Sequence, residues 1–313
     1  MTDDLARLGP PQLPRYYEPM ASLSGVITAM VTPFAEDGAL DLESARTLAA
    51  HLVENGSHGL VVAGTTGESP TLSDDEKLRL LDAVLDEVGD RATVIAGTGS
   101  NDTHHSAELT RAAAKSGAHA VLVVTPYYNK PNRAGLRAHF HAVADAAGDT
   151  PVVLYNIPSR CVINVPPDLL ADLAREIPNV VAVKQANDED LGPIEGLNVL
   201  AGNDEVFLRT LELKGAGGIL VASHIVGREM RALYEAQLSG DGSRARELDA
   251  SLEPVYQALA ITSNPTPVKT ALEMLGVIEG HLRLPMVPAS QRERDAIRTA
   301  LERHGLLVAG GTT

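Results

Sequence analysis

Residues 120–157 read AVLVVTPYYNKPNRAGLRAHFHAVADAAGDTPVVLYNI. Two short runs rich in β-branched residues stand on either side of a longer amphipathic segment. This alternation is typical of a strand, a helix and a second strand, joined as a βα unit of a parallel sheet. Both runs are continuously apolar rather than alternating, as strands buried on both faces are.

The same alternation recurs from residue 25 to residue 241. Eight apolar runs begin at residues 25, 59, 92, 120, 152, 180, 198 and 217. Eight such units favour a closed barrel over an open, doubly wound sheet, so the predicted fold class is α/β, a (β/α)8 TIM barrel. Asp41 and Ser73 precede two helical stripes and are expected to cap them. The sixth and seventh units are short and leave room only for brief helices.

Three regions are predicted along the chain. Residues 1–24 are rich in proline and polar residues and form a loose N-terminal extension. Residues 25–241 form the barrel. Residues 242–313 show helical stripes and no strand pattern, with helices expected at 266–275 and 290–304, and they form a small C-terminal helical domain.

The composition limits the partners and the compartment. The 313 residues include 41 acidic and 26 basic side chains, a net charge of −15. Such a surface repels nucleic acid and anionic membranes, so neither is an expected partner. Cys161 is the only cysteine, which suits a reducing cytosol, and no general-base pattern accompanies it as a nucleophile. No signal peptide and no run of about 18 uncharged apolar residues is seen, so we expect a cytoplasmic protein.

Polar residues collect where the predicted strands end. They occur in GTTGES (64–69), TPYYNKP (125–131), YNIPSR (155–160), Lys184 and AGND (201–204). The carboxyl ends of barrel strands meet on one face, where the active sites of such barrels are built. The sequence therefore predicts a site on this face.

Lys184 follows the apolar run VVAV and is expected to face the barrel interior. Burial disfavours the ammonium form and lowers the pKa of a lysine, and the neutral amine can then attack a carbonyl to form an imine. Considered alone, Lys184 also fits a structural role, paired with a carboxylate in a layer of the barrel.

Three further groups each allow two interpretations. The loop 64–69 is either a plain turn or a source of hydroxyl and N–H groups for a carboxylate; it lacks the GxxxxGK[ST] pattern of a nucleotide P-loop. Tyr127, Tyr128 and Tyr155 are either hydrogen-bonded core phenols or acid–base groups. Arg160 either forms a surface ion pair or clamps a carboxylate. The ten histidines show no metal-binding spacing, so no metal or other cofactor is expected.

Taken together, the motifs resemble the dihydrodipicolinate synthase family, whose wider group includes N-acetylneuraminate lyase. The resemblance covers about residues 25–305 and is carried by GVITAMVTPF, GTTGES, TPYYNKP, YNIPSR, VAVK, SNPTPVKTALEMLG and LRLPMVP. It implies condensation of pyruvate with L-aspartate 4-semialdehyde to 4-hydroxy-tetrahydrodipicolinate, on the route to diaminopimelate and lysine. It also implies a homotetramer, a dimer of dimers.

The resemblance assigns catalytic roles to four residues. Lys184 would form the imine with pyruvate, and Tyr155 would shuttle protons to and from it. Thr65 would link Tyr155 to Tyr128 in a relay. Tyr128 would reach into the site of the neighbouring subunit.

Substrate binding is implied for further positions. Thr65 and Thr66 would hold the pyruvate carboxylate, and Arg160 would hold the carboxylate of the aldehyde. Ile219 would border the pocket through its backbone. After Lys184 the chain reads KQAND, where many relatives have an acidic residue next and a glycine at the end of the turn. The pocket wall near Gln185 is therefore less well defined by the resemblance than the imine chemistry.

Two other functions compete with this one. An aldolase of the same group, such as N-acetylneuraminate lyase or a 2-keto-3-deoxy sugar acid aldolase, would share Lys184 and Tyr155 but usually lacks the arginine that corresponds to Arg160. A non-catalytic barrel that senses 2-oxo acids would be expected to have lost Lys184 or Tyr155.

The resemblance also bears on feedback control. In feedback-inhibited relatives, lysine binds at a dimer interface through two histidines and a glutamate. The corresponding positions here are Asp74, Lys77 and His105, while Asn101 and Tyr127 of that cleft are retained. We therefore expect weak or absent inhibition by lysine.

Overall fold

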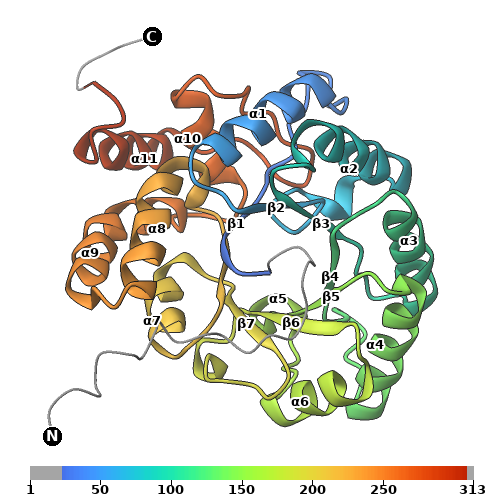
Figure 1. Ribbon diagram of the computed structural model, residues 1–313. Helices are drawn as coiled ribbons and strands as arrows, with labels where there is room; N and C mark the ends of the chain where they lie inside the picture. Colours follow the sequence, from blue (N-terminus) through green and yellow to red (C-terminus); the bar gives the residue numbers. More distant parts are fainter. Residues whose placement is uncertain (1–22, 309–313) are drawn as a thin grey trace, which may run out of the picture.

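The computed structural model describes residues 23–308, which form a closed barrel of eight parallel strands (Figure 1). Each strand pairs with the next in the chain, and β8 pairs with β1. The strands are β1 Gly25–Ala29, β2 Gly59–Val62, β3 Thr93–Gly97, β4 Ala120–Val124, β5 Val152–Asn156, β6 Val180–Gln185, β7 Asn198–Ala201 and β8 Gly217–Leu220. The predicted (β/α)8 TIM barrel is confirmed, since every strand begins within one residue of a predicted apolar run.

The strands are apolar throughout because the barrel interior covers one of their faces and the helices cover the other. β1, β2 and β5 are buried along their whole length. Inward-pointing side chains, among them Ile27, Val61 and Tyr155, form one apolar cluster inside the barrel. Outward-pointing side chains pack with the helices in a second, larger cluster. The interior is thus a packed core, and the open ends of the strands are left to carry a site.

A ring of helices surrounds the strands (Figure 1). They are α1 Leu42–Glu54, α2 Asp74–Val88, α3 Thr103–Lys115, α4 Arg133–Ala147, α5 Pro158–Cys161, α6 Pro167–Glu176, α7 Phe207–Glu212 and α8 Ser223–Leu238, with 3-10 turns η1 Ser69–Thr71, η2 Asp188–Asp190 and η3 Asp204–Val206. The caps are as predicted: the Asp41 side chain accepts from the N–H of Ser44, and Ser73 forms a reciprocal capping box with Glu76. The units after β6 and β7 hold only η2, η3 and the six-residue α7, as expected from their length.

Three helices follow the barrel and lie on one side of the ring, near α8 (Figure 1). They are α9 Gly242–Leu259, α10 Thr266–Met274 and α11 Gln291–Arg303, of which the last two correspond to the helices predicted at 266–275 and 290–304. The predicted loose extension, 1–24, falls almost wholly on residues 1–22, which lie outside the described residues. Between residues 23 and 308, no helix has the length and apolar character needed to cross a membrane.

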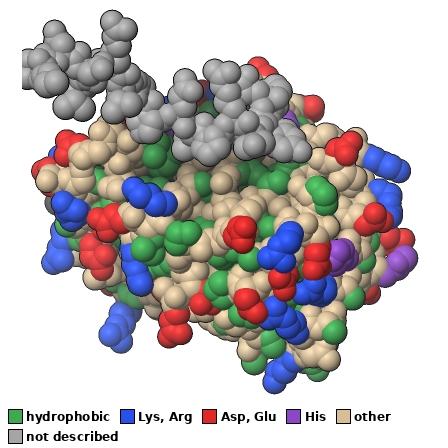
Figure 2. Space-filling model, turned by 60° about the horizontal axis from the view of Figure 1, so that its bottom comes forward, with side chains coloured by type: hydrophobic (Ala, Val, Ile, Leu, Met, Phe, Trp, Pro, Cys, Tyr) green, Lys and Arg blue, Asp and Glu red, His purple; other side chains and the backbone are tan. Residues whose placement is uncertain are grey.

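Acidic and basic side chains are intermixed on the face of the molecule shown in Figure 2, although the net charge is −15. Ion pairs between α4 and α6 show how opposite charges are matched locally. Arg133 lies 2.8 Å from Asp168, and Arg137 lies 2.9 Å from Asp172. Because these pairs are partly exposed to solvent, each contributes little to the free energy of unfolding.

Candidate active site

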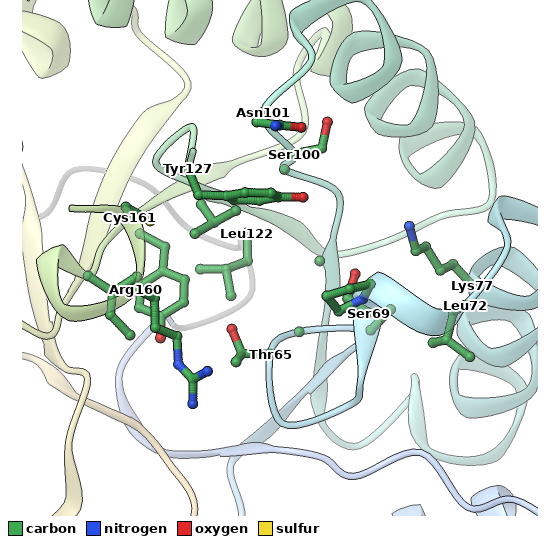
Figure 3. A pocket seen from close by; sticks show the side chains of 18 of the residues that line it. Thr65, Ser69, Leu72, Lys77, Ser100, Asn101, Leu122, Tyr127, Arg160 and Cys161 are labelled. Atoms are coloured by element: carbon green, nitrogen blue, oxygen red, sulfur yellow. The ribbon is translucent and has the colours of Figure 1, made fainter. Parts of the chain in front are cut away.

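A cavity of about 790 Å³ lies at the carboxyl ends of β2, β3, β4 and β5 (Figure 3). Thr65 reaches it from the loop after β2, Tyr127 from the loop after β4, and Arg160 from α5. In Figure 3 these three side chains surround the same space, and Lys77 lies at its other end. The cavity therefore joins three of the strand ends at which the sequence concentrates polar residues.

Lys184 and Tyr155 lie side by side inside the barrel. They belong to neighbouring strands, β6 and β5, whose register pairs the two residues directly. Each residue is only 5% exposed, and the Lys184 Nζ lies 4.4 Å from the centre of the Tyr155 ring. Tyr155 lines the cavity, whereas Lys184 is not among the lining residues. The amine thus lies next to the cavity wall, behind a phenol that forms part of it.

The environment of Lys184 favours the neutral amine. Burial lowers the pKa of Lys184 to about 8; the Asp204 carboxylate opposes this shift, and the Arg160 charge adds to it. At that pKa about a tenth of the amine is neutral at pH 7, against about 0.04% for an ordinary lysine. Within residues 23–308 no ion pair joins Lys184 to a carboxylate. The geometry thus favours the chemical interpretation of Lys184 over a structural pair.

The Tyr155 phenol forms a side-chain hydrogen bond with Thr65. Burial raises the pKa of Tyr155 to about 12, although Arg160 and the Thr65 bond act in the opposite direction. The phenol is therefore protonated at neutral pH and is connected to a hydroxyl that can exchange a proton with it. A group of this kind beside an amine can carry protons during formation and breakdown of an imine.

The other candidate residues occupy three different places. Thr66 is 2% exposed, and its Oγ1 accepts a hydrogen bond of 2.8 Å from the Asn264 Nδ2, so it points toward the C-terminal helices rather than lining the cavity. Ile219 lies in β8 and is fully buried in the barrel interior. Tyr128 lies at the cavity rim, is 84% exposed and has a positive φ of 70°. A single chain therefore brings together Lys184 and Tyr155, with Thr65 and Arg160 close by, but leaves Tyr128 outside this group.

Asp204 is a charged neighbour of Lys184 that the motifs did not single out. Its carboxylate accepts hydrogen bonds from the N–H groups of Val221 (2.9 Å) and Ala222 (3.1 Å), just after β8. Burial raises the pKa of Asp204 to about 6, while these bonds lower it. The signal in the sequence was a carboxylate at the end of a barrel strand, within AGND.

Gln185 of the KQAND variant faces away from the barrel interior. Successive side chains of a strand point to opposite faces, so Gln185 turns outward where Lys184 turns inward. Gln185 is fully buried, and its Oε1 accepts from the Asn156 Nδ2 (2.9 Å) and from the Asn187 N–H (3.1 Å). Neither Gln185 nor Asn187 lines the cavity. The departure from the family pattern therefore lies behind β6 and not in the pocket wall.

The far end of the cavity holds a small charged cluster. Asp74 accepts from the Lys77 Nζ at 3.4 Å and pairs with the His105 Nε2 at 2.7 Å. All three line the cavity together with Asn101 and Tyr127. In the part of the chain from 23 to 308, no group of three or more His, Cys, Asp or Glu side chains could hold a metal ion.

Comparison with known proteins agrees with this architecture. The model of the dihydrodipicolinate synthetase family matches residues 22–304. A 4-hydroxy-tetrahydrodipicolinate synthase of Symbiobacterium thermophilum is 48% identical over 294 residues, which cover 92% of this chain and 100% of that relative.

Solved structures are similar over most of the chain. The synthase of Cyanidioschyzon merolae with lysine bound shares 40% identity, with a TM-score of 0.88 over 91% of this chain and 99% of that one. The chloride-inhibited synthase of Acinetobacter baumannii in complex with pyruvate shares 35%, with a TM-score of 0.88 over 91% and 100%. A monomeric synthase variant shares 39%, with a TM-score of 0.89 over 92% and 99%. From the family match and these likenesses, the chain belongs to the dihydrodipicolinate synthetase family.

Proposed function

We propose that the protein is a Schiff-base-forming lyase that condenses pyruvate with L-aspartate 4-semialdehyde to 4-hydroxy-tetrahydrodipicolinate, on the route to diaminopimelate and lysine. The observation that carries the proposal is the buried Lys184 amine, with its lowered pKa, beside the Tyr155 phenol that is hydrogen-bonded to Thr65. Membership of the family supports it, because the relative at 48% identity bears the name of this synthase.

The chemistry starts at Lys184. Its neutral amine attacks the ketone carbon of pyruvate, and water leaves as the imine forms. Loss of a proton from the methyl group gives an enamine, which attacks the aldehyde carbon of the second substrate. The amino group of that substrate then attacks the imine carbon, which closes the ring and frees Lys184. Tyr155 and Thr65 carry the protons that these steps release and consume, with Tyr128 of a neighbouring subunit completing the relay.

Two carboxylates must be bound within a protein of net charge −15. Thr65 and Thr66 would supply hydroxyl and N–H groups to the pyruvate carboxylate. Arg160, which lines the cavity, would hold the carboxylate of the aldehyde in a charge-assisted hydrogen bond. Ile219 would border the bound pyruvate through its backbone.

The alternative is cleavage of a sugar acid, as in N-acetylneuraminate lyase or a 2-keto-3-deoxy sugar acid aldolase. Arg160 favours the short, charged aldehyde over a neutral polyhydroxyl chain. The test is a pair of assays on the purified protein, one with pyruvate and aspartate semialdehyde and one for release of pyruvate from sugar acids. Turnover in the first at least about 100-fold above the second is expected, and the reverse order would refute the proposed function.

We also propose a homotetramer in the cytoplasm. The support is the position of Tyr128, which is exposed at the cavity rim. From there its side chain would reach the site of a second subunit that packs against this face. Mixing Tyr128→Phe chains with Lys184→Ala chains should restore partial activity, because some mixed dimers then contain one complete site. A fully active monomer in analytical ultracentrifugation would contradict this arrangement.

A further inference from the structure

We propose that Lys269 of α10 is a positioning residue: its buried ion pair with Glu68 holds the loop 64–69, and with it Thr65 and Thr66, in the position that binds the 2-oxo acid. The proposal rests on the proposed function, since it assigns the C-terminal helices a part in pyruvate binding. It concerns two residues, Glu68 and Lys269, that do not line the cavity.

The backbone of the loop 64–69 has a conformation that contacts with the rest of the protein must stabilise. Glu68 has a φ of 55°, in the left-handed region that residues with a side chain seldom adopt. Such a conformation persists where the surrounding structure fixes it, and it is often found at functional sites. Glu68 is also 3% exposed, so its carboxylate is kept from water. The groups that surround this carboxylate therefore determine the course of the loop.

Two residues from the C-terminal part of the chain satisfy the Glu68 carboxylate. The Lys269 Nζ donates to one oxygen at 2.6 Å, and the Arg283 N–H donates to the other at 3.1 Å. The Lys269 Nζ also donates to the carbonyl of His281 at 2.7 Å, which fixes the ammonium itself. Both cations also contact the Phe34 ring, with the Lys269 Nζ 4.4 Å and the Arg283 guanidinium carbon 4.3 Å from its centre.

The threonines are held at the same time. The Asn264 Nδ2 donates to the Thr66 Oγ1 at 2.8 Å, and the Thr32 hydroxyl donates to the Gly67 carbonyl at 2.7 Å. Because its oxygen already accepts from Asn264, the Thr66 hydroxyl can donate its own proton elsewhere. Thr65, one residue earlier, keeps its bond to Tyr155. The loop is therefore held from its C-terminal side by Glu68 and Asn264, while its other face stays free for the cavity.

A buried ion pair fixes the orientation of its two side chains but adds little to the free energy of unfolding. Replacing both partners by neutral groups of similar shape often leaves the stability of a protein nearly unchanged, whereas removing one partner leaves an unpaired buried charge. The pair of Lys269 and Glu68 can thus be removed as a unit. Its loss is expected to change the placement of Thr65 and Thr66 more than the stability of the fold.

The test is the double variant Glu68→Gln/Lys269→Met in the full-length chain. A shift of the threonines by about 1 Å should lower kcat/KM for pyruvate by about 100-fold, with a rise in the KM for pyruvate, because the threonines bind its carboxylate. The KM for aspartate semialdehyde, which depends on Arg160, should change less than about twofold. Hydrogen–deuterium exchange of peptides covering 60–75 should become faster than in the wild type. A role limited to stability would reduce the fraction of folded enzyme and leave both KM values unchanged.

The matched control is Glu273→Gln/Arg294→Met, which removes a 2.8 Å ion pair between α10 and α11 without touching the loop. This control should keep the wild-type KM for pyruvate and the wild-type exchange of 60–75. If the first double variant does not fold, Lys269→Arg decides the question: it keeps the positive charge but not the placement of the Nζ between Glu68 and the His281 carbonyl, and the pyruvate KM should rise by about fivefold, as for the loss of one hydrogen bond.

The outcomes separate this proposal from the proposed function. An unchanged pyruvate KM in the folded double variant, or in Lys269→Arg if that one is needed, overturns the role of Lys269. A wild-type protein that does not condense pyruvate refutes the proposed function instead. In that case unchanged exchange of 60–75 in the double variant would still overturn the role of Lys269, and faster exchange would support it.

Discussion

The Lys184 Nζ lies 4.4 Å from the centre of the Tyr155 ring, and the register of β5 and β6 pairs the two residues directly. A shift of this register by one residue would turn one of the two side chains to the outer face of the barrel. Each strand of the closed barrel pairs with a neighbour on both of its edges, which fixes its register. The backbone therefore keeps the amine and the phenol next to each other. The reacting pair is therefore preorganised before any substrate binds.

Tyr155→Phe should separate imine formation from turnover. The variant keeps the ring beside Lys184 but loses the hydroxyl that bonds to Thr65, so kcat should fall by about 100-fold or more. Trapping of pyruvate on Lys184 should persist, although more slowly. Steady-state kinetics and mass spectrometry of the trapped enzyme check both parts. A kcat within about threefold of the wild type would show that Tyr155 carries no proton.

The pH dependence should follow the amine of Lys184, whose pKa is lowered to about 8. Below this pKa the ammonium form dominates and cannot attack a carbonyl, so the rate of imine formation should fall about tenfold for each pH unit. Above about pH 8 the rate should level off. Stopped-flow measurement of pyruvate binding between pH 6 and 10 gives the profile. A rate that keeps rising to pH 10 would mean that the lysine titrates like an ordinary one.

Arg160→Ala should affect the two substrates unequally. Loss of a charge-assisted hydrogen bond costs about 1.5–3 kcal/mol, which corresponds to a rise of about 10- to 160-fold in the KM for the aldehyde. Pyruvate binding should change little. Arg160→Lys is the matched control, because it keeps the charge near Lys184 but not the planar fork. Equal losses for both substrates would argue against a role of Arg160 in binding the aldehyde.

Inhibition by lysine is expected to be weak or absent. The Asp74 carboxylate is already paired with Lys77 and His105, and an ammonium at Lys77 would lie close to the ammonium groups of the ligand. His105 also stands where the resemblance implies a glutamate for lysine binding, so that carboxylate is missing here. Lysine titrated into the steady-state assay should give half-inhibition above about 1 mM, the concentration that corresponds to −4.1 kcal/mol. The variant Lys77→His/His105→Glu should be inhibited at lower lysine concentrations than the wild type. Half-inhibition of the wild type well below about 1 mM lysine would contradict this account of the cleft.

Local patterns predicted the strands, the helices and their caps, because each depends on a few neighbouring residues. Asp41 and Ser73 show this: both bond to N–H groups only three residues away. The bond of Lys269 to Glu68 spans 201 residues, and nothing in either local sequence indicates its partner. The sequence placed Lys269 only within the helix expected at 266–275. Asp204 was visible at a strand end, but its closeness to Lys184 depends on the register in which β6 pairs with β7.

The central claim is that Lys184 carries the substrate as an imine. The most direct test is incubation of the protein with pyruvate and borohydride, followed by peptide mass spectrometry. The expected result is one reduced three-carbon unit per chain on the peptide that contains Lys184, and no such unit in Lys184→Ala. A unit on Lys130, Lys214 or Lys269 instead, or none in a chain that still turns over its substrates, would contradict it.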